Sequence, residues 1–345
     1  MDDLYNYAAI TTKIRAMSGK LLTDNDFKEI VSLSNVTSVE AYLKKLPAYQ
    51  KIFEDFTDPE IHRGRLEFIL ERSLYDDFSK IYLFTDTSQR RFLQHYARRF
   101  EIKFLKKCIS NAFVNQQVEK ENLIFKDFFN QYTCLDLEHL CHCQTIEQVL
   151  DTVHSTAYYP VLYGQYSSHA DLFDYETALD LFHFQSMWEK KDDVVLKKNL
   201  DILKHTYGTK FDILNLWYIH RAKKYFKLSD VDTYALTIPI LYRLKKEEIQ
   251  ELVNSHSEQE FQNILARTYY GRKYKNILTE ELGDMYVRIC KDVLRAEARE
   301  NPYSIATVYY YLYRKEHEIS RLTVAIECVR YQVNSIDAMK YVLKY

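Results

Sequence analysis

The sequence predicts an all-α protein that consists of three similar helical units. Three observations lead to this fold class. Two short patterns recur with a period of about 110 residues, turn-forming residues are scarce, and the segments between the patterns have helical periodicity. The chain has 345 residues, which is more than one ordinary hydrophobic core accommodates, and the repeat sets the number of units at three.

Two patterns define the repeat. The first is an acid, an apolar residue, a Leu three positions further on, and then Ser or Thr, Glu or Gln and an apolar residue at +9, +11 and +13 from the acid. Its copies begin at Glu29, Asp136 and Glu248. The second is an acid, an Ile and, three positions later, a Leu. Its copies begin at Glu101, Asp212 and Glu318, which lie 72, 76 and 70 residues after the first pattern.

The first pattern predicts the end of one helix and the start of the next. Its hydroxyl residues are Ser38, Thr145 and Ser257. Such residues are typical N-caps, because their side chains accept a hydrogen bond from a first-turn amide. The residues at +11 are Glu40, Glu147 and Gln259. We expect them in the first turn, where the charge of the two glutamates is stabilised by the helix dipole, and we assign the pattern to capping and packing.

The remaining elements are long helices. Apolar residues fall on one face of residues 89–113, including Phe92, Tyr96 and Phe100, and at 1.5 Å per residue this helix would be roughly 37 Å long. Further helices are predicted at 64–84, 175–207, 210–226, 279–299 and 303–331. Six Gly and five Pro, where average usage gives about 40, favour long helices with short connections. No segment alternates convincingly with period two, so strands are not predicted.

Prolines indicate the joints between these helices. Pro47, Pro59, Pro160 and Pro302 lie between helical patterns, whereas Pro239 either kinks a helix or starts one. Together with the repeat they place three domains at residues 1–118, 119–228 and 229–345.

Composition excludes several classes of protein. Lys and Arg total 47 and Asp and Glu total 49, with no basic block and no acidic tail, which argues against binding to nucleic acid or to a membrane through a polybasic patch. No apolar run approaches the ~18 residues of a membrane span, and the N-terminus is acidic, unlike a signal peptide. We therefore expect a soluble, cytosolic protein whose six cysteines are reduced thiols.

No catalytic residue, cofactor site or metal site is assigned. Gly19-Lys20 lacks the other residues of a phosphate-binding loop, and Asp76-Asp77 and Asp192-Asp193 lack the third carboxylate of an Asp-rich metal motif. Asp and His are three residues apart at Asp136/His139, Asp151/His154 and Asp180/His183. The densest thiol cluster is Cys134, His139, Cys141, His142 and Cys143. We interpret the Asp/His pairs as ordinary polar pairs. We interpret the cysteine and histidine cluster as residues near a helix terminus, because adjacent helical positions face different directions and so do not all bind one ion.

Two segments carry a resemblance to a known family. The first is residues 7–22, with Lys13-Ile14-Arg15-Ala16-Met17 and Leu21-Leu22. The second is Asn301-Pro302-Tyr303-Ser304-Ile305, followed by Tyr311-Leu312, Arg314-Lys315-Glu316, Glu318-Ile319 and Leu322. Both resemble the C subunit of bacterial and archaeal A/V-type rotary ATPases (ATP synthases), whose counterpart in the vacuolar ATPase is the d subunit. Arg321 departs from the family, which often carries Asn at that position.

The resemblance covers the full length and implies a helical funnel of three similar domains in pseudo-threefold arrangement, with a central cavity. Such a protein is not an enzyme. It caps the membrane proteolipid ring and receives the central shaft, so that torque from ATP hydrolysis drives transport of H⁺ or Na⁺. The resemblance also implies a peripheral position on the cytoplasmic side of the membrane. A free-standing helical scaffold and, less favoured, an all-α enzyme with a cavity between repeats are the alternatives.

One aromatic segment is a candidate for the shaft-facing surface. It comprises Tyr309, Tyr310, Tyr311, Tyr313 and Arg314. The density of aromatic residues alone supports this role. The competing interpretation, which we favour, places these tyrosines in a domain core.

Overall fold

The protein is all-α, as predicted. The computed structural model describes residues 2–54, 63–195 and 198–344, and it is 78% helical. No described residue lies in a strand. Within the same ranges, no helix is both long enough and apolar enough to cross a bilayer. The chain divides into two compact units, each with its own core, and both draw on segments that are distant in sequence.

Unit 1 combines the beginning of the chain, residues 116–144 and the C-terminal helices. Its helices are α1 (Asp2–Ser18), α2 (Asp24–Val31), α3 (Val36–Leu43), α4 (Gln50–Glu54), α5 (Arg63–Tyr82), the 3₁₀ helix η1 (Lys120–Phe125), α7 (Lys126–Tyr132), α8 (Leu137–His142), α19 (Ile305–Arg330) and α20 (Ser335–Lys344). The first residues of α6 (Thr87–Phe113) also belong to it.

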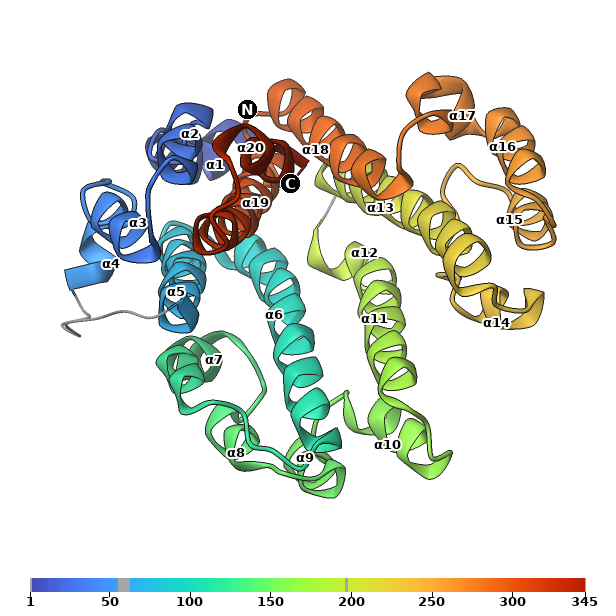
Figure 1. Cartoon of the computed structure of the whole chain (residues 1–345), viewed down its shortest axis with the longest axis horizontal. Helices are drawn as coiled ribbons and strands as arrows, with labels where there is room; N and C mark the ends of the chain where they lie inside the picture. The colour runs from blue at the N-terminus through green and yellow to red at the C-terminus, as the bar shows by residue number, and fades with distance from the viewer. Residues whose placement is uncertain (1, 55–62, 196–197, 345) are drawn as a thin grey trace. The chain divides into compact units, whose positions relative to one another are not determined.

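Helices from opposite ends of the chain form the core of unit 1. Helix α19, drawn in red, contacts the blue helices α1 and α2 and also α5 (Figure 1). Phe27 and Ile30 of α2 share one hydrophobic cluster with Leu322 and Ile326 of α19. The last long helix is therefore enclosed by the first helices of the chain, and neither segment buries its apolar face without the other.

Unit 2 contains the rest of α6 and the middle of the chain. Its further helices are α9 (Ile146–Val153), α10 (Tyr159–Ser167), α11 (Leu172–Glu189), α12 (Lys191–Val194), α13 (Lys198–Arg221), the π-helical turn η2 (Ala222–Phe226), α14 (Asp230–Ala235), α15 (Lys246–Val253), α16 (Glu258–Arg267), α17 (Tyr269–Lys273), the 3₁₀ helix η3 (Lys275–Leu278) and most of α18 (Leu282–Glu300). Ile213 and Leu216 of α13 pack with Leu252 of α15, Phe261 of α16 and Met285 of α18 in one cluster.

Four of the six predicted long helices are confirmed within a few residues, as α5, α6, α18 and α19. The break predicted between 207 and 210 is wrong. The chain is helical from Lys198 to Arg221, and the interruption lies earlier, between α11 and α13. Gly208 lies inside α13 and packs closely against Tyr242. A Cβ added to this glycine would lie 2.4 Å from Cγ of Tyr242. This glycine permits a close contact and does not end a helix.

The predicted caps are confirmed in the second and third copies of the first pattern. Thr145 and Ser257 are the N-caps of α9 and α16, and their side chains accept from Gln148 N and Glu260 N. Glu147 and Gln259 lie in the first turns, as expected.

The first copy of the pattern is an exception. Asn35 caps α3 and accepts from Ser38 N, so Ser38 is not the cap. As a result, Glu40 lies beyond the first turn and forms an ion pair with Lys44. The prediction failed because Asn is as good a cap as Ser and occurs three residues earlier here.

Prolines separate helices at two of the expected positions. Pro47 lies in the turn after α3, and Pro302 lies between α18 and α19. Pro160 lies in the first turn of α10, where its missing amide costs nothing. Pro239 neither kinks nor starts a helix, because it lies in the irregular segment before α15. Pro59 lies outside the described residues.

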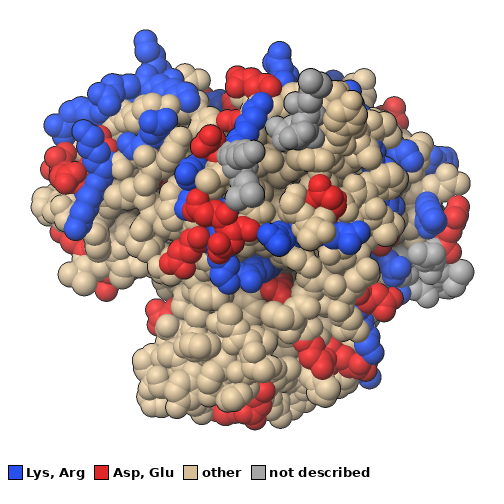
Figure 2. Space-filling view, turned by 180° about the vertical axis from the view of Figure 1, so that it is seen from behind, with Lys and Arg blue, Asp and Glu red and all other residues tan. Residues whose placement is uncertain are grey.

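Charges of both signs are mixed over most of the surface that Figure 2 displays. Basic side chains gather at the upper left of this view. The net charge of −2 therefore conceals local differences, and any ligand site must be sought from local groups of side chains.

Candidate functional site

The predicted shaft-facing segment lies in the first half of α19 and divides into two groups. Tyr309 and Tyr311 are buried, with 4% and 2% of their surface exposed. The Tyr309 ring lies 6.1 Å from that of Phe92, and the Tyr311 hydroxyl donates to Asp77 Oδ2 at 2.6 Å. Burial and the Asp77 carboxylate raise the pKa of Tyr311, so this phenol is a neutral donor. These two tyrosines are part of the interior of unit 1.

The other three residues of the segment are half-buried. Tyr313 and Arg314 follow Tyr310 by three and four positions, so all three lie on one side of the helix. The Arg314 guanidinium lies 5.7 Å from the centre of the Tyr310 ring, and the Tyr313 ring contacts that of His317 in a tilted arrangement with ring centres 4.1 Å apart. We call Tyr310, Tyr313 and Arg314 the α19 stripe. It has the amphipathic aromatic and arginine composition of protein interfaces.

The second pattern of the repeat marks a buried acid that accepts a hydrogen bond from a buried tyrosine. Tyr158 donates to Glu101, Tyr270 donates to Asp212 at 2.9 Å, and Tyr49 donates to Glu318 at 2.6 Å. All six side chains are buried. The tyrosines follow the acids of the first pattern by 20, 22 and 22 residues, a regularity that was not predicted from the sequence.

The pairing is shifted by one repeat. The acids of the first and second repeats pair with the tyrosines of the repeat that follows each, and the acid of the third repeat pairs with the tyrosine of the first. Each pair therefore joins the last long helix of one repeat to the opening helices of another. This matches the core of unit 1, where α19 packs against α2.

The pair in unit 1 contains an additional cation. Lys315 is 1% exposed, and its Nζ donates to Glu318 Oε1 at 2.8 Å and to the Tyr49 hydroxyl at 3.0 Å. The Leu22 amide donates to the other carboxylate oxygen at 2.5 Å. Burial and the Glu318 carboxylate raise the pKa of Tyr49. A buried ion pair with this many partners fixes the position of α19 against the start of α2.

The Asp212 pair in unit 2 fixes a loop. Asp212 is fully buried, and its two oxygens accept from the amides of Tyr242, Arg243 and Leu244 at 3.0, 2.6 and 3.1 Å. Burial raises the pKa of Asp212, although these amides and the Tyr270 hydroxyl act in the opposite direction. The amides immediately precede α15, as Leu22 precedes α2, so both carboxylates hold the entrance to an equivalent helix.

Two histidines of unit 2 are buried in uncharged form. Burial and nearby Arg98 lower the pKa of His95 to about 4, and burial also lowers the pKa of His183, with Lys210 close by. Their effect is on stability.

We expect His95 to make the protein acid-sensitive. Its folded pKa of about 4 lies below the unfolded value, so the stability it contributes is complete above pH ~6.5 and disappears as the pH falls through 4. Between pH 7 and pH 4 this amounts to roughly 3 kcal/mol of unfolding free energy. Urea titrations at both pH values should therefore show a smaller loss for His95→Gln than for the wild type. Exposed His142→Gln is the control, and an equal loss in all three proteins would contradict the assignment.

An apolar groove lies in unit 2 between α11, α13, η2 and α14. Its volume is about 530 Å³. Its apolar lining includes Phe173, Leu181, Phe184, Trp217, Phe226 and Leu236. Asp171, Glu176 and Asp180 also line it, and Asp180 forms an ion pair with Lys106. An apolar lining with a few carboxylates is typical of a cleft that binds a ligand or the apolar side chains of a partner.

The cysteine and histidine cluster lies around α8. His139 pairs with Asp136, the N-cap of that helix, and His142 Nδ1 bonds the Glu138 carbonyl. Cys141 and Cys143 are buried, whereas Cys134 is exposed. Among the described residues, no group of three or more His, Cys, Asp or Glu side chains is placed to hold a metal ion.

Comparisons with known proteins agree with the resemblance. The family described as ATP synthase (C/AC39) subunit matches residues 10–341. The A-type ATP synthase C subunit of Methanothermobacter thermautotrophicus is 24% identical over 337 residues, which cover 93% of this chain and 83% of the relative. The protein of the same name from Methanobrevibacter smithii is 24% identical over 345 residues, covering 95% and 85%. That from Methanocaldococcus jannaschii is 26% identical over 227 residues, covering 64% and 55%.

The match extends over nearly the whole chain and includes most of both segments that carry the resemblance. It confirms the predictions of a rotary ATPase subunit and of an accessory, non-catalytic protein. The chain belongs to the ATP synthase (C/AC39) subunit family.

Proposed function

We propose that this chain is the central-stalk subunit that couples the rotating shaft of an A-type ATP synthase to its membrane proteolipid ring, on the cytoplasmic side. The observation that carries the proposal is the match over residues 10–341, with relatives named as the C subunit of A-type ATP synthases. In this role the chain transmits torque and performs no bond chemistry. H⁺ and Na⁺ are both compatible with it, because the ion would bind to other subunits.

The local structure suits a part that carries load. Helices α6, α13 and α19 have 27, 24 and 26 residues, and few glycines interrupt them. A coupling part should be stiff, since a flexible joint would store torque as elastic strain. Buried acid–tyrosine pairs at the helix junctions add directional contacts to the apolar packing.

We further propose that the three repeats, 1–118, 119–228 and 229–345, form three similar modules around an axis, as in a funnel. The recurring acid–tyrosine pair supports this arrangement, because the same contact occurs once for each repeat. The shifted pairing links each repeat to another, because the last long helix of one repeat packs against the opening helices of another.

The decisive experiment is reconstitution of the complex with and without this chain. We expect ATP hydrolysis in both preparations but ATP-driven ion uptake into vesicles only when the chain is present. Unchanged uptake without the chain would refute the coupling role. Co-purification with shaft and ring subunits distinguishes it from a free-standing scaffold.

The α19 stripe provides a test at the level of residues. A Tyr310→Asp, Tyr313→Asp double variant places charge on a half-buried surface, so we expect a folded protein that no longer assembles with the shaft. Tyr331→Asp is the control, since Tyr331 at the other end of α19 is 67% exposed. Circular dichroism and thermal unfolding establish folding. Normal assembly of the double variant would show that the α19 stripe is not part of the interface with the shaft.

A further inference from the structure

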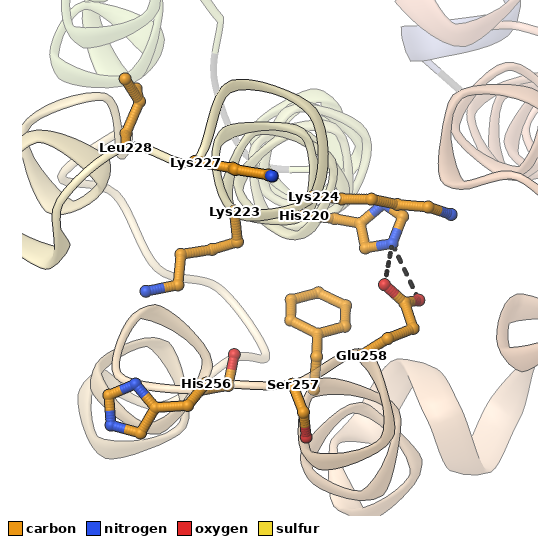
Figure 3. A pocket seen from close by; sticks show the side chains of 10 residues that line it. His220, Lys223, Lys224, Lys227, Leu228, His256, Ser257 and Glu258 are labelled. Carbon is orange, nitrogen blue, oxygen red and sulfur yellow. Dashed lines mark hydrogen bonds and ion pairs between the residues drawn. The ribbon is translucent and has the colours of Figure 1, made fainter.

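A second pocket in unit 2 has a basic lining. It lies between the end of α13 with η2 on one side and the start of α16 on the other, and its volume is about 350 Å³. We call it the basic pocket. Its lining is His220, Lys223, Lys224, Lys227, Leu228, Ser255, His256, Ser257, Glu258 and Phe261. Figure 3 shows the lysines on the α13 side, facing His256, Ser257 and Glu258 on the other.

The end of α13 explains why three lysines meet here. The helix widens into the π-helical turn η2 and stops at Lys227, whose φ of 50° is left-handed. The Leu228 amide closes this turn on the Ala222 carbonyl at 3.0 Å. Glycine is the usual residue at a left-handed helix end, because it avoids a steric cost. A lysine there places an ammonium group at the edge of the pocket.

Two of the charges in and around the pocket are already paired. Lys223 bonds Asp230 at 2.5 Å, and His220 Nε2 lies 3.0 Å from Glu258 Oε1. Burial raises the pKa of Glu258, but the His220 hydrogen bond and the Lys224 charge lower it by more. The pKa therefore lies below its ordinary value, and this carboxylate is ionised at neutral pH.

Three donor groups have no such partner. In the part of the chain that the structure describes, the Lys224 and Lys227 ammonium groups form no ion pair, and the His256 ring forms no hydrogen bond. Lys224 is exposed, lies 5.3 Å from the Tyr225 ring, and is near enough to Glu258 to lower the pKa of that carboxyl. The lining has three lysines and one glutamate, and Asp230 pairs with Lys223 from outside it, so one positive charge is in excess when both histidines are neutral.

We propose that the basic pocket binds a phosphate group, either free or as part of a small organic phosphate. The lining contains lysines and no arginine. Lysine ammonium groups act as point charges and are common ligands of phosphate oxygens. A volume of about 350 Å³ accommodates a phosphate together with an organic body. The Ser257 hydroxyl can also donate, since its oxygen accepts from Glu260 N.

The lysines carry this inference, and the start of α16 does not. Glu258 and Glu260 lie in the first turn of that helix, where they already offset the positive end of the helix dipole. The site is independent of the coupling role proposed above.

The test is calorimetric titration of the full chain with inorganic phosphate and with pyrophosphate. We expect binding to the wild type and affinity reduced at least about tenfold in Lys224→Gln, Lys227→Gln, because two charge-assisted contacts are lost. The matched control is Lys28→Gln, Lys45→Gln, which removes the same charge from exposed positions of unit 1. Equal affinity in both double variants would overturn the proposal.

A variant with increased affinity tests the pocket without relying on a loss of binding, which misfolding could also cause. Glu258→Gln removes the negative charge inside the pocket and keeps a partner for His220, so we expect phosphate affinity to rise about threefold. Unchanged or weaker binding by Glu258→Gln would contradict the proposal.

The source of the phosphate is distinguished by co-sedimentation with vesicles. Phosphatidylglycerol vesicles are compared with phosphatidylcholine vesicles for the wild type and both double variants. Sedimentation with phosphatidylglycerol alone that is lost in Lys224→Gln, Lys227→Gln assigns the pocket to a lipid headgroup. Phosphate or pyrophosphate binding without such sedimentation assigns it to a soluble phosphate. Failure of every probe to bind the wild type would refute the site.

Discussion

Glu318→Ala should destabilise the protein by about 4 kcal/mol, because it leaves a buried cation without its counter-charge. Lys315 is 1% exposed and has Glu318 and Tyr49 as its hydrogen-bonding partners. The Tyr49 hydroxyl and the Leu22 amide would also lose their acceptor. Urea unfolding of the isolated chain measures the effect, and the exposed Glu300→Ala should change the unfolding free energy by less than about 0.5 kcal/mol.

A double variant separates the charge from the packing. If the unpaired ammonium group causes much of the loss, Lys315→Met combined with Glu318→Leu should recover part of it, since an apolar pair of similar volume often replaces a buried ion pair without cost. The recovery is partial because the Tyr49 hydroxyl and the Leu22 amide still lack their acceptor. A loss below about 1 kcal/mol in Glu318→Ala, or no recovery in the double variant, would show that the ion pair does not hold α19 in place.

Much of the fold could be predicted from the sequence because the relevant forces are local. Helical periodicity and the shortage of glycine and proline located α5, α6, α18 and α19, and the hydroxyl residues located two of three caps at Thr145 and Ser257. One failure had a local cause, since Asn35 replaces Ser38 as the cap of α3, whereas another was decided by a contact outside the local segment. The break expected between residues 207 and 210 is absent, because α13 continues through Gly208, against which Tyr242 packs.

The partners of the repeated acids could not be predicted from local sequence. Glu318 and Tyr49 are separated by 269 residues, and Asp212 and Tyr270 by 58, so no periodicity within a helix connects them. The period of the repeat contained the missing signal, because these tyrosines recur in register with the first pattern. The tyrosines of α19 were hard to assign for a related reason. Aromatic density does not distinguish buried Tyr309 and Tyr311 from half-buried Tyr310 and Tyr313.

The basic pocket also could not be predicted from the charges in the sequence. Lys223, Lys224 and Lys227 are a minor feature of a chain with 47 basic residues. They form a group with His256 only because the turn after α13 faces the start of α16.

Asp212→Ala should cost about 4 kcal/mol, comparable to Glu318→Ala, but for a different reason. Here no cation is buried. Instead, the three amides of residues 242–244 and the Tyr270 hydroxyl lose one common acceptor, and each unsatisfied buried donor costs roughly 1–3 kcal/mol. We expect the unfolding free energy to fall accordingly. Hydrogen exchange should accelerate first at the amides of residues 242–244, because they lead into α15.

The isosteric change Asp212→Asn tests whether both oxygens of the carboxylate are needed. Asn keeps one oxygen and replaces the other with an NH₂ group, which would face the donors that now approach that oxygen. If acceptor geometry dominates, Asp212→Asn should lose at least half as much stability as Asp212→Ala, whereas Tyr270→Phe, which removes a single donor, should lose only about 1 kcal/mol. A nearly neutral Asp212→Asn would mean that a single oxygen holds the loop. The negative charge and the second oxygen of the carboxylate would then be dispensable for holding the loop.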